Sequence, residues 1–180
     1  MVCRRGKASG PQDESNAVDI GVRVESPAEF MNRSPISAMS PSLVYFFRRL
    51  RRPRPHLLHE PVRFVVTENN NGLMTVNGHS YANKKSQNTN FAILVSKQFT
   101  EPFHEPIEYG KYIASLANML GGGPIVQRLG DLRDGRRSTP ERIRRGLVQP
   151  TMLSAAPGDL SLVLPYRFFK GYYGDVRSAG

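Results

Sequence analysis

Arginine side chains concentrate between residues 39 and 55, MSPSLVYFFRRLRRPRP, where no acidic residue occurs. A planar guanidinium binds phosphate oxygens bidentately, so this stretch has the chemistry of a polyanion-binding arm. Apolar residues at positions i, i+3, i+4 and i+7 precede or interrupt the arginines and predict a short amphipathic helix that docks on protein. These apolar residues are Leu43, Phe46, Phe47 and Leu50. The expected RNA contacts are Arg48, Arg49, Arg51, Arg52 and Arg54.

The same stretch fits two other roles. No aspartate or glutamate occurs from Phe30 to His59, and an acid-free, arginine-flanked amphipathic helix is typical of a mitochondrial presequence. Translation from Met31 or Met39 instead of Met1 would place that helix at the front of the chain. A solvated helix whose aromatic residues pack on the domain is the third interpretation. The sequence leaves targeting, RNA contact and internal packing open.

A second arginine cluster spans residues 128 to 145, with seven arginines and three acidic residues. Such a density suits phosphate contacts at several points, whereas exposed ion pairs with the nearby acids would contribute little. We therefore expect this cluster to bind RNA, together with two lysines of a polar loop. The residues concerned are Arg136, Arg137, Arg142, Arg144 and Arg145 in the cluster and Lys84 and Lys85 in the loop.

No set of residues predicts a catalytic or metal site. His56 and His59 are close enough in sequence to share a metal, but no further ligand pair has suitable spacing. His104 lies in a polar, proline-rich segment that is typical of exposed loops. The glycines at 121–123 lack the preceding strand and the lysine of a phosphate-binding loop, so they indicate a helix end. We expect a protein that is not an enzyme and needs no cofactor or metal.

Aromatic and basic residues alternate in the C-terminal segment, residues 166–180. This pattern fits either stacking on unpaired bases or docking on protein, and we favour docking. The docking residues expected here are Phe168, Phe169, Tyr172 and Tyr173.

The hydrophobic patterns predict an α+β fold with a small antiparallel sheet. Turn residues at Asn69–Gly72 predict a hairpin over about 62–76, and apolar runs predict strands over about 91–99 and 160–166. A helix packed on the sheet is expected over about 107–120, with Tyr109, Tyr112, Ile113, Leu116, Ala117 and Leu120 on its apolar side. Short helices are expected after Pro124 and after Thr139.

These elements define four regions. Residues 1–38 are expected to form a flexible tail with a short helix, begun by Ser26-Pro27, and residues 39–59 the basic arm or presequence-like helix. Residues 60–165 form the compact core, and residues 166–180 are an aromatic, basic tail. The two ends of the chain are thus basic, partly irregular extensions of the core.

The charge balance indicates a polyanionic partner. The 180 residues carry a formal charge of +10, and the single cysteine excludes an internal disulfide. No apolar stretch approaches the length of a membrane span. We expect a non-catalytic RNA-binding structural component of a large ribonucleoprotein, specifically a mitochondrial ribosomal protein of the matrix, which contacts structured RNA and neighbouring proteins. The alternatives are a peripheral accessory subunit of a mitochondrial membrane complex, a small enzyme, or a cytoplasmic location.

Overall fold

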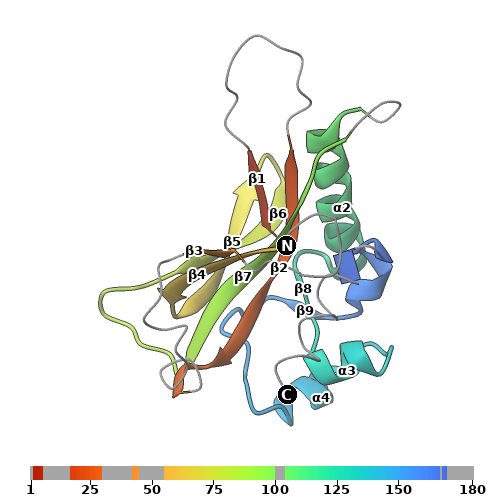
Figure 1. Ribbon diagram of the computed structural model, residues 1–180. Coiled ribbons are helices and arrows are strands. Elements are labelled where there is room, and N and C mark those ends of the chain that lie inside the picture. The colour runs from red at the N-terminus through yellow and green to blue at the C-terminus, as the bar shows by residue number, and fades with distance from the viewer. Residues whose placement is uncertain are drawn as a thin grey trace.

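The chain folds around an antiparallel sheet to which its N-terminal part contributes two strands (Figure 1). The computed structural model describes residues 2–5, 17–29, 42–44, 55–99, 104–166, 168 and 169. The strands of this sheet lie in the order β1-β2-β7-β4-β3. They are β1 (Val2–Arg5), β2 (Val18–Pro27), β7 (Asn88–Lys97), β4 (Pro55–Val62) and β3 (Ser42–Val44).

The central strand, β7, is covered on both faces. In the register between β2 and β7, Ile20 pairs with Val95, and both side chains belong to the main core. Ala92 and Leu94 belong instead to a second cluster, formed with the hairpin. Because both faces are apolar, β7 reads as a continuous hydrophobic run rather than an alternating one. The strand predicted at 91–99 is confirmed, although it begins at Asn88.

The expected hairpin is also confirmed. It consists of β5 (Phe64–Asn70) and β6 (Leu73–His79), joined by Asn71 and Gly72. Both turn residues have positive φ, 53° and 87°, which is the geometry of a type I′ turn and explains the Asn-Gly pair. The Gly72 N–H donates to the Asn69 side chain at 2.8 Å and fixes the turn.

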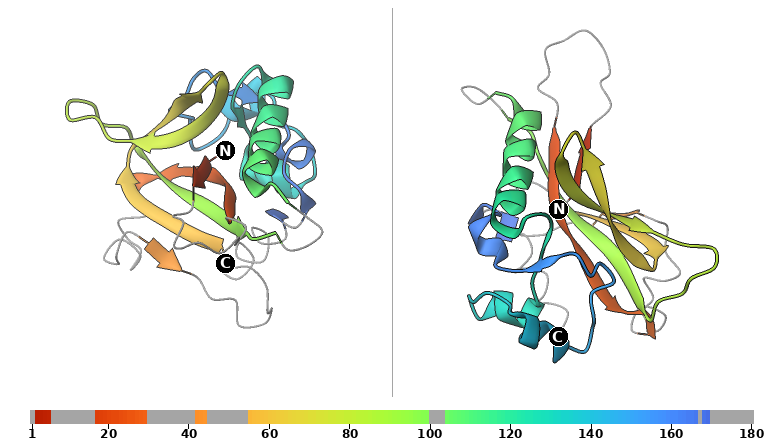
Figure 2. Two further views of the ribbon diagram at one scale, coloured as in Figure 1. Left: turned by 90° about the horizontal axis from the view of Figure 1, so that it is seen from above. Right: turned by 180° about the vertical axis from the view of Figure 1, so that it is seen from behind.

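A helix, α2 (Pro106–Gly121), covers one face of the sheet, as Figure 2 shows from behind. Its buried residues Ile113 and Ala117 pack in the main core, and Gly122, with φ 68°, ends it. Asn118 binds the backbone of β6: the Met74 N–H donates to Oδ1 at 2.7 Å, and Nδ2 donates to the Met74 carbonyl at 2.8 Å. The helix thus satisfies backbone groups at the outer edge of the hairpin. The helix predicted at 107–120 is confirmed.

A layer of short elements follows α2 and lies on the same side of the sheet (Figure 2). Its two short strands pair in parallel. The elements are β8 (Ile125–Val126), α3 (Leu129–Arg133), α4 (Pro140–Arg144), β9 (Ala156–Pro157) and a 3₁₀ helix (Leu160–Leu162). The helix expected after Thr139 is confirmed as α4, whereas the residues after Pro124 form β8 before α3 begins.

The strand predicted at 160–166 is wrong, because a 3₁₀ helix forms there. The Asp159 carboxylate accepts the Ser161 N–H at 2.9 Å, and the Leu164 N–H donates to the Leu160 carbonyl at 2.8 Å. These local bonds turn the backbone. The alternating leucines therefore do not face one way: Leu164 is buried, but Leu162 is 66% exposed.

The flexible tail is wrong for residues 18–27, which form β2. Val18 and Ile20 are 1% and 0% exposed in the main core. Charged residues between the apolar ones hid this alternation. Ser26 and Pro27 are the last residues of the strand, and Ala28 and Glu29, which follow them, are helical as expected. Gly21 is needed where β2 meets β7, since a Cβ there would lie 2.0 Å from the Ile93 carbonyl oxygen.

The helix expected in the basic arm is wrong for residues 42–44. These residues form β3, in which Leu43 pairs with Leu57 of β4. β4 itself begins at Pro55 and pairs with β7, so part of the region assigned to the arm belongs to the sheet. The arm between residues 45 and 54 lies outside the described residues.

A polar network connects the sheet to the C-terminal layer. The Glu25 carboxylate accepts the Thr151 N–H at 3.1 Å and the Asn88 side-chain amide at 2.9 Å, and that amide also donates to the Gln149 carbonyl. On the same strand, Arg23 donates to the buried Asn90 at 2.7 Å. The bonds of Glu25 and Asn88 hold the segment that follows α4 against β2 and β7, and the Arg23 bond links those two strands to each other.

Candidate nucleic-acid interface

The arginine cluster of residues 128–145 is built around the carboxylate of Asp131, which is 1% exposed. Oδ2 accepts a hydrogen bond from the Ser138 hydroxyl at 2.8 Å, and Oδ1 accepts one from Arg136 Nε at 2.9 Å. Arg142 Nη1 lies 3.8 Å from Oδ1. One carboxylate therefore ties α3 to the loop that follows it and to α4.

The pKa of Asp131 reflects this arrangement. Burial on its own raises the pKa, but the hydrogen bonds from Ser138 and Arg136 and the charges of Arg142 and Arg136 outweigh it. The net effect is a pKa below the usual value for aspartate. The group is thus an anion that organises the cluster, not a proton donor.

Polar side chains fix both ends of α4. At the start of α4, the Arg142 N–H donates to Thr139 Oγ1 at 3.4 Å. Gln149 Nε2 donates to the carbonyls of Ile143, Arg144 and Gly146 at its end, at 2.9–3.2 Å. The backbone that carries the last arginines is therefore held in place although α4 has only five residues.

Among the described residues of the cluster at 128–145, four exposed arginines form no ion pair: Arg133, Arg137, Arg144 and Arg145. Arg136 differs, since it contacts both Asp131 and Asp134. Arg142 also differs, because its guanidinium lies near Asp131 and donates to the Arg137 carbonyl. The five arginines of the cluster that were expected to bind RNA thus fall into two groups. Arg136 and Arg142 contact Asp131, whereas Arg137, Arg144 and Arg145 are exposed and have no acidic partner. Arg133 adds a fourth that the sequence analysis did not select.

Lys84 and Lys85 are exposed but are not brought near this cluster. They lie on the loop between β6 and β7, which projects from the sheet on the side away from α3 and α4 (Figures 1 and 2). An RNA that touches both regions must therefore reach around the molecule.

Several expected site residues lie outside the described residues. These are Arg48, Arg49, Arg51, Arg52 and Arg54 of the arm, Phe46, Phe47 and Leu50 of its apolar stripe, and Tyr172 and Tyr173 of the tail. Of Leu43, only the backbone pairing in β3 is described. Their roles stay predictions.

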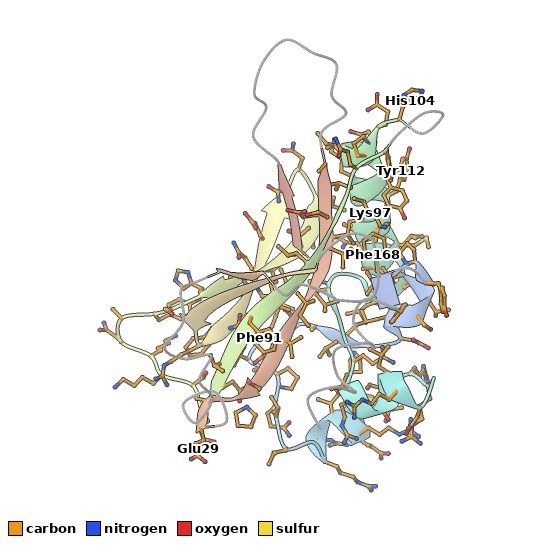
Figure 3. The ribbon with its side chains drawn as sticks, in the orientation of Figure 1. Glu29, Phe91, Lys97, His104, Tyr112 and Phe168 are labelled. Atoms are coloured by element: carbon orange, nitrogen blue, oxygen red, sulfur yellow. The ribbon has the colours of Figure 1, made fainter. Side chains whose placement is uncertain are left out.

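Phe168 and Phe169, which were expected to dock on protein, dock on the domain's own core. The two rings are 2% and 8% exposed and pack in the main core with Ile20, Val95 and Ile113. The main core, to which both α2 and the sheet contribute, accommodates the pair. Figure 3 shows Phe168 near the lower end of α2.

The outer face of α2 carries apolar residues that the sequence analysis assigned to the core side. Ile113 and Ala117 are buried as expected, but Tyr112 is 70% exposed and points away from the sheet (Figure 3). Leu116, Met119 and Leu120 are also exposed. The signal was present in the sequence, because apolar residues at 112, 113, 116, 117, 119 and 120 cover more than one helical face.

A small cavity of about 80 Å³ lies beneath the C-terminal layer. Its lining is mostly apolar and includes Val65, Val76, Ala117, Ile125 and Met152. Among the described residues, no group of three or more histidine, cysteine, aspartate or glutamate side chains is placed to hold a metal ion. In the same part of the chain, no helix has the length and apolarity to cross a membrane.

No protein-family model matches the chain, and no significant match was found among curated proteins or among solved structures. Function must therefore be argued from the side chains themselves.

Proposed function

We propose that this protein is a non-catalytic, RNA-binding structural component of a large ribonucleoprotein, specifically a mitochondrial ribosomal protein. The observation that carries the proposal is the group of four exposed arginines without ion pairs, Arg133, Arg137, Arg144 and Arg145. They extend from a frame that Asp131, Thr139 and Gln149 hold in place.

Phosphate binding is the chemistry that this arrangement favours. Four like charges on one short segment repel one another in the free protein, and a polyanion relieves that repulsion while it releases counterions. The frame fixes the backbone before binding, so little backbone entropy is lost on contact. Contacts of this kind position a protein on RNA without reading its sequence, which suits a structural role.

The outer face of α2 supports the assembly part of the proposal. Tyr112 and Met119 are 70% and 71% exposed, and Leu116 and Leu120 extend the apolar area between and beside them. An apolar helix face suits contact with protein more than contact with phosphate. We propose that a neighbouring protein of the same assembly covers it.

The mitochondrial matrix is proposed from the acid-free, arginine-rich stretch between residues 30 and 59. A reporter fused to residues 39–60 should enter mitochondria, and substitution of the arginines at 48, 49, 51 and 52 by glutamate should abolish entry. A diffuse cytosolic signal from the unmutated fusion would remove the organelle from the proposal.

The RNA-binding proposal is tested by measuring affinity for a structured RNA against salt concentration. Replacing Arg133, Arg137, Arg144 and Arg145 by glutamine should flatten the slope of log K against log salt by about three, because each neutralised phosphate contributes about 0.7 to 0.9. Lys111→Gln, which removes a charge that pairs with Glu108 on α2, is the control and should leave the slope unchanged. An unaltered slope in the four-arginine variant contradicts the proposal.

The alternative, a peripheral subunit of a mitochondrial membrane complex, is favoured by one observation. Leu147 is 82% exposed and follows Arg144 and Arg145 after a single glycine, so an apolar side chain lies near cations as it does at a lipid interface. Binding to vesicles that contain anionic lipid, lost on Leu147→Gln, together with no affinity for RNA, would support this alternative over the first proposal.

A further inference from the structure

A second basic region, on the loop of residues 80–87, carries one exposed aromatic side chain, Tyr81. Phe64 and His79 pair across the hairpin at the open end of β5 and β6. The Tyr81 ring lies edge-to-face against both, with centroids 5.2 Å from Phe64 and 4.5 Å from His79. Tyr81 nevertheless remains 44% exposed. The three rings form an aromatic group at the edge of the molecule instead of a buried core.

Cations surround this aromatic group. Lys84 Nζ lies 5.6 Å from the Tyr81 ring centroid, within the range of a cation–π contact. Lys85 is exposed on the same loop, and Arg63 is exposed at its base. No aspartate or glutamate occurs between residues 77 and 98. The local charge is therefore positive, and it is not offset by acids of the loop.

The loop is held at its base. Arg63 Nη1 donates to the Ser86 carbonyl at 3.0 Å, and the Ser86 hydroxyl donates to the Arg63 carbonyl at 2.6 Å. Ser86 Oγ also accepts the Asn88 N–H at 3.2 Å, where β7 begins. The aromatic group is thus presented by a closed loop, and Figure 2 shows that loop projecting clear of the sheet.

We infer that Tyr81, supported by Phe64 and His79, is a stacking site for unpaired bases of a single-stranded nucleic acid, with Arg63, Lys84 and Lys85 on the flanking phosphates. The inference rests on the proposed function and adds the class of ligand: a strand with accessible bases. An exposed ring beside cations is the combination that single-stranded nucleic acid requires, since every base has a π-face and every linkage a phosphate. A duplex hides its base faces and gains nothing from Tyr81.

The test measures the affinity of the full-length protein for a single-stranded RNA 12-mer and for the same RNA as a duplex. Tyr81→Ala should weaken single-strand binding roughly 5- to 150-fold, the range expected for the loss of one stacked base. Duplex affinity and the salt slope should stay unchanged, because no phosphate contact is lost. Tyr81→Phe retains the ring and should retain affinity. Equal loss on both probes, or no loss on either, overturns the inference.

A fluorescence measurement gives an independent result. The chain has no tryptophan, so Tyr81→Trp places a single indole at the site. Single-stranded RNA should quench its emission, and the duplex should not. Emission that neither probe changes overturns the inference, even if affinity changes. Quenching by single-stranded DNA of the same sequence supports stacking without recognition of the sugar, whereas quenching by RNA alone supports a site that also discriminates the 2′-hydroxyl.

The test of the stacking site and the test of the arginine cluster can fail independently of each other. If the four-arginine variant keeps the wild-type salt slope while Tyr81→Ala still distinguishes single strand from duplex, the arginine cluster is wrong and the stacking site stands. If the slope falls but Tyr81→Ala has no effect, the cluster stands and the stacking site is overturned. No binding to either RNA contradicts both.

Discussion

Asp131 contacts Ser138, Arg136 and Arg142, which come from separate turns of the segment between β8 and β9. A buried carboxylate with three such partners is favoured as the anion, and its charge strengthens the contacts with the two arginines. The exposed arginines nearby carry the proposed function, and Asp131 is one of the groups that hold their backbone in place, with Thr139 and Gln149. A residue that would not itself touch RNA therefore shapes the proposed site.

Asp131→Asn should lower the free energy of unfolding at neutral pH, and the difference from wild type should depend on pH. The folded pKa is depressed, so the stabilisation is fully present above the unfolded pKa of about 3.9. It is lost as pH falls through the lower folded pKa. Urea unfolding at pH 7, 5, 4 and 3 should show a constant difference at the first two values and a shrinking one below. A difference that grows toward pH 3 would contradict the assignment.

Asp134→Asn is the matched control. Asp134 also pairs with Arg136, at 2.8 Å, but its side chain is 55% exposed. Exposed pairs of this kind contribute about 0–1 kcal/mol, so this variant should unfold nearly as wild type does at every pH.

Among the secondary-structure elements, α2 has two apolar faces with different roles. Ile113 and Ala117 face the sheet, whereas Tyr112 and Met119 face away from it. Met119→Gln should change the free energy of unfolding of the isolated protein by no more than about 0.5 kcal/mol, as expected at an exposed site. Ile113→Ala should cost about 2–5 kcal/mol because it opens a cavity in the core. Urea unfolding checks both values.

A loss of more than about 2 kcal/mol with Met119→Gln would mean that this face is covered in the isolated chain. The proposal that a neighbouring protein occupies it would then be wrong.

The sequence predicted the elements whose signals are local. The Asn-Gly turn, the apolar run of β7 and the proline and glycine at the ends of α2 each specify their structure within a few residues. Prediction from the sequence failed for elements whose conformation depends on tertiary contacts. β2 alternates correctly but mixes its apolar residues with Asp19, Arg23 and Glu25, whose partners come from distant strands and loops. At the candidate site, composition identified the arginine cluster, but only the structure separates the arginines that Asp131 holds from those left exposed.

At the scale of the whole molecule, the position of β2 limits where the folded protein can start or be processed. β2 pairs with β7 along its full length, and β4 pairs with β7 on the other side. A chain that began at Met39 would lack β2, and one processed after residue 59 would also lose most of β4. The fold therefore favours a protein that keeps the arginine-rich stretch, as the RNA-binding arm requires. If this stretch also directs import into mitochondria, as proposed above, it does so without being cleaved.

A chain that starts at Met39 should accordingly show no cooperative unfolding transition in urea, while the full chain does. Ile20→Ala in the full chain tests the same point with one substitution: Ile20 is 0% exposed, and its truncation should cost about 2–5 kcal/mol. Val24→Ala, at a half-buried position of the same strand, should cost less. Wild-type stability in the chain from Met39 would show that β2 is dispensable.

The proposed function is tested in the cell by asking what the protein touches there. The full-length protein is irradiated in its native assembly and purified, and its peptides are searched for cross-linked nucleotides. We predict that RNA copurifies, that the particle sediments as a ribosomal subunit, and that nucleotide adducts fall within residues 128–149 and in the loop that carries Tyr81. Copurification with a membrane complex free of RNA, without adducts in either region, would contradict the account.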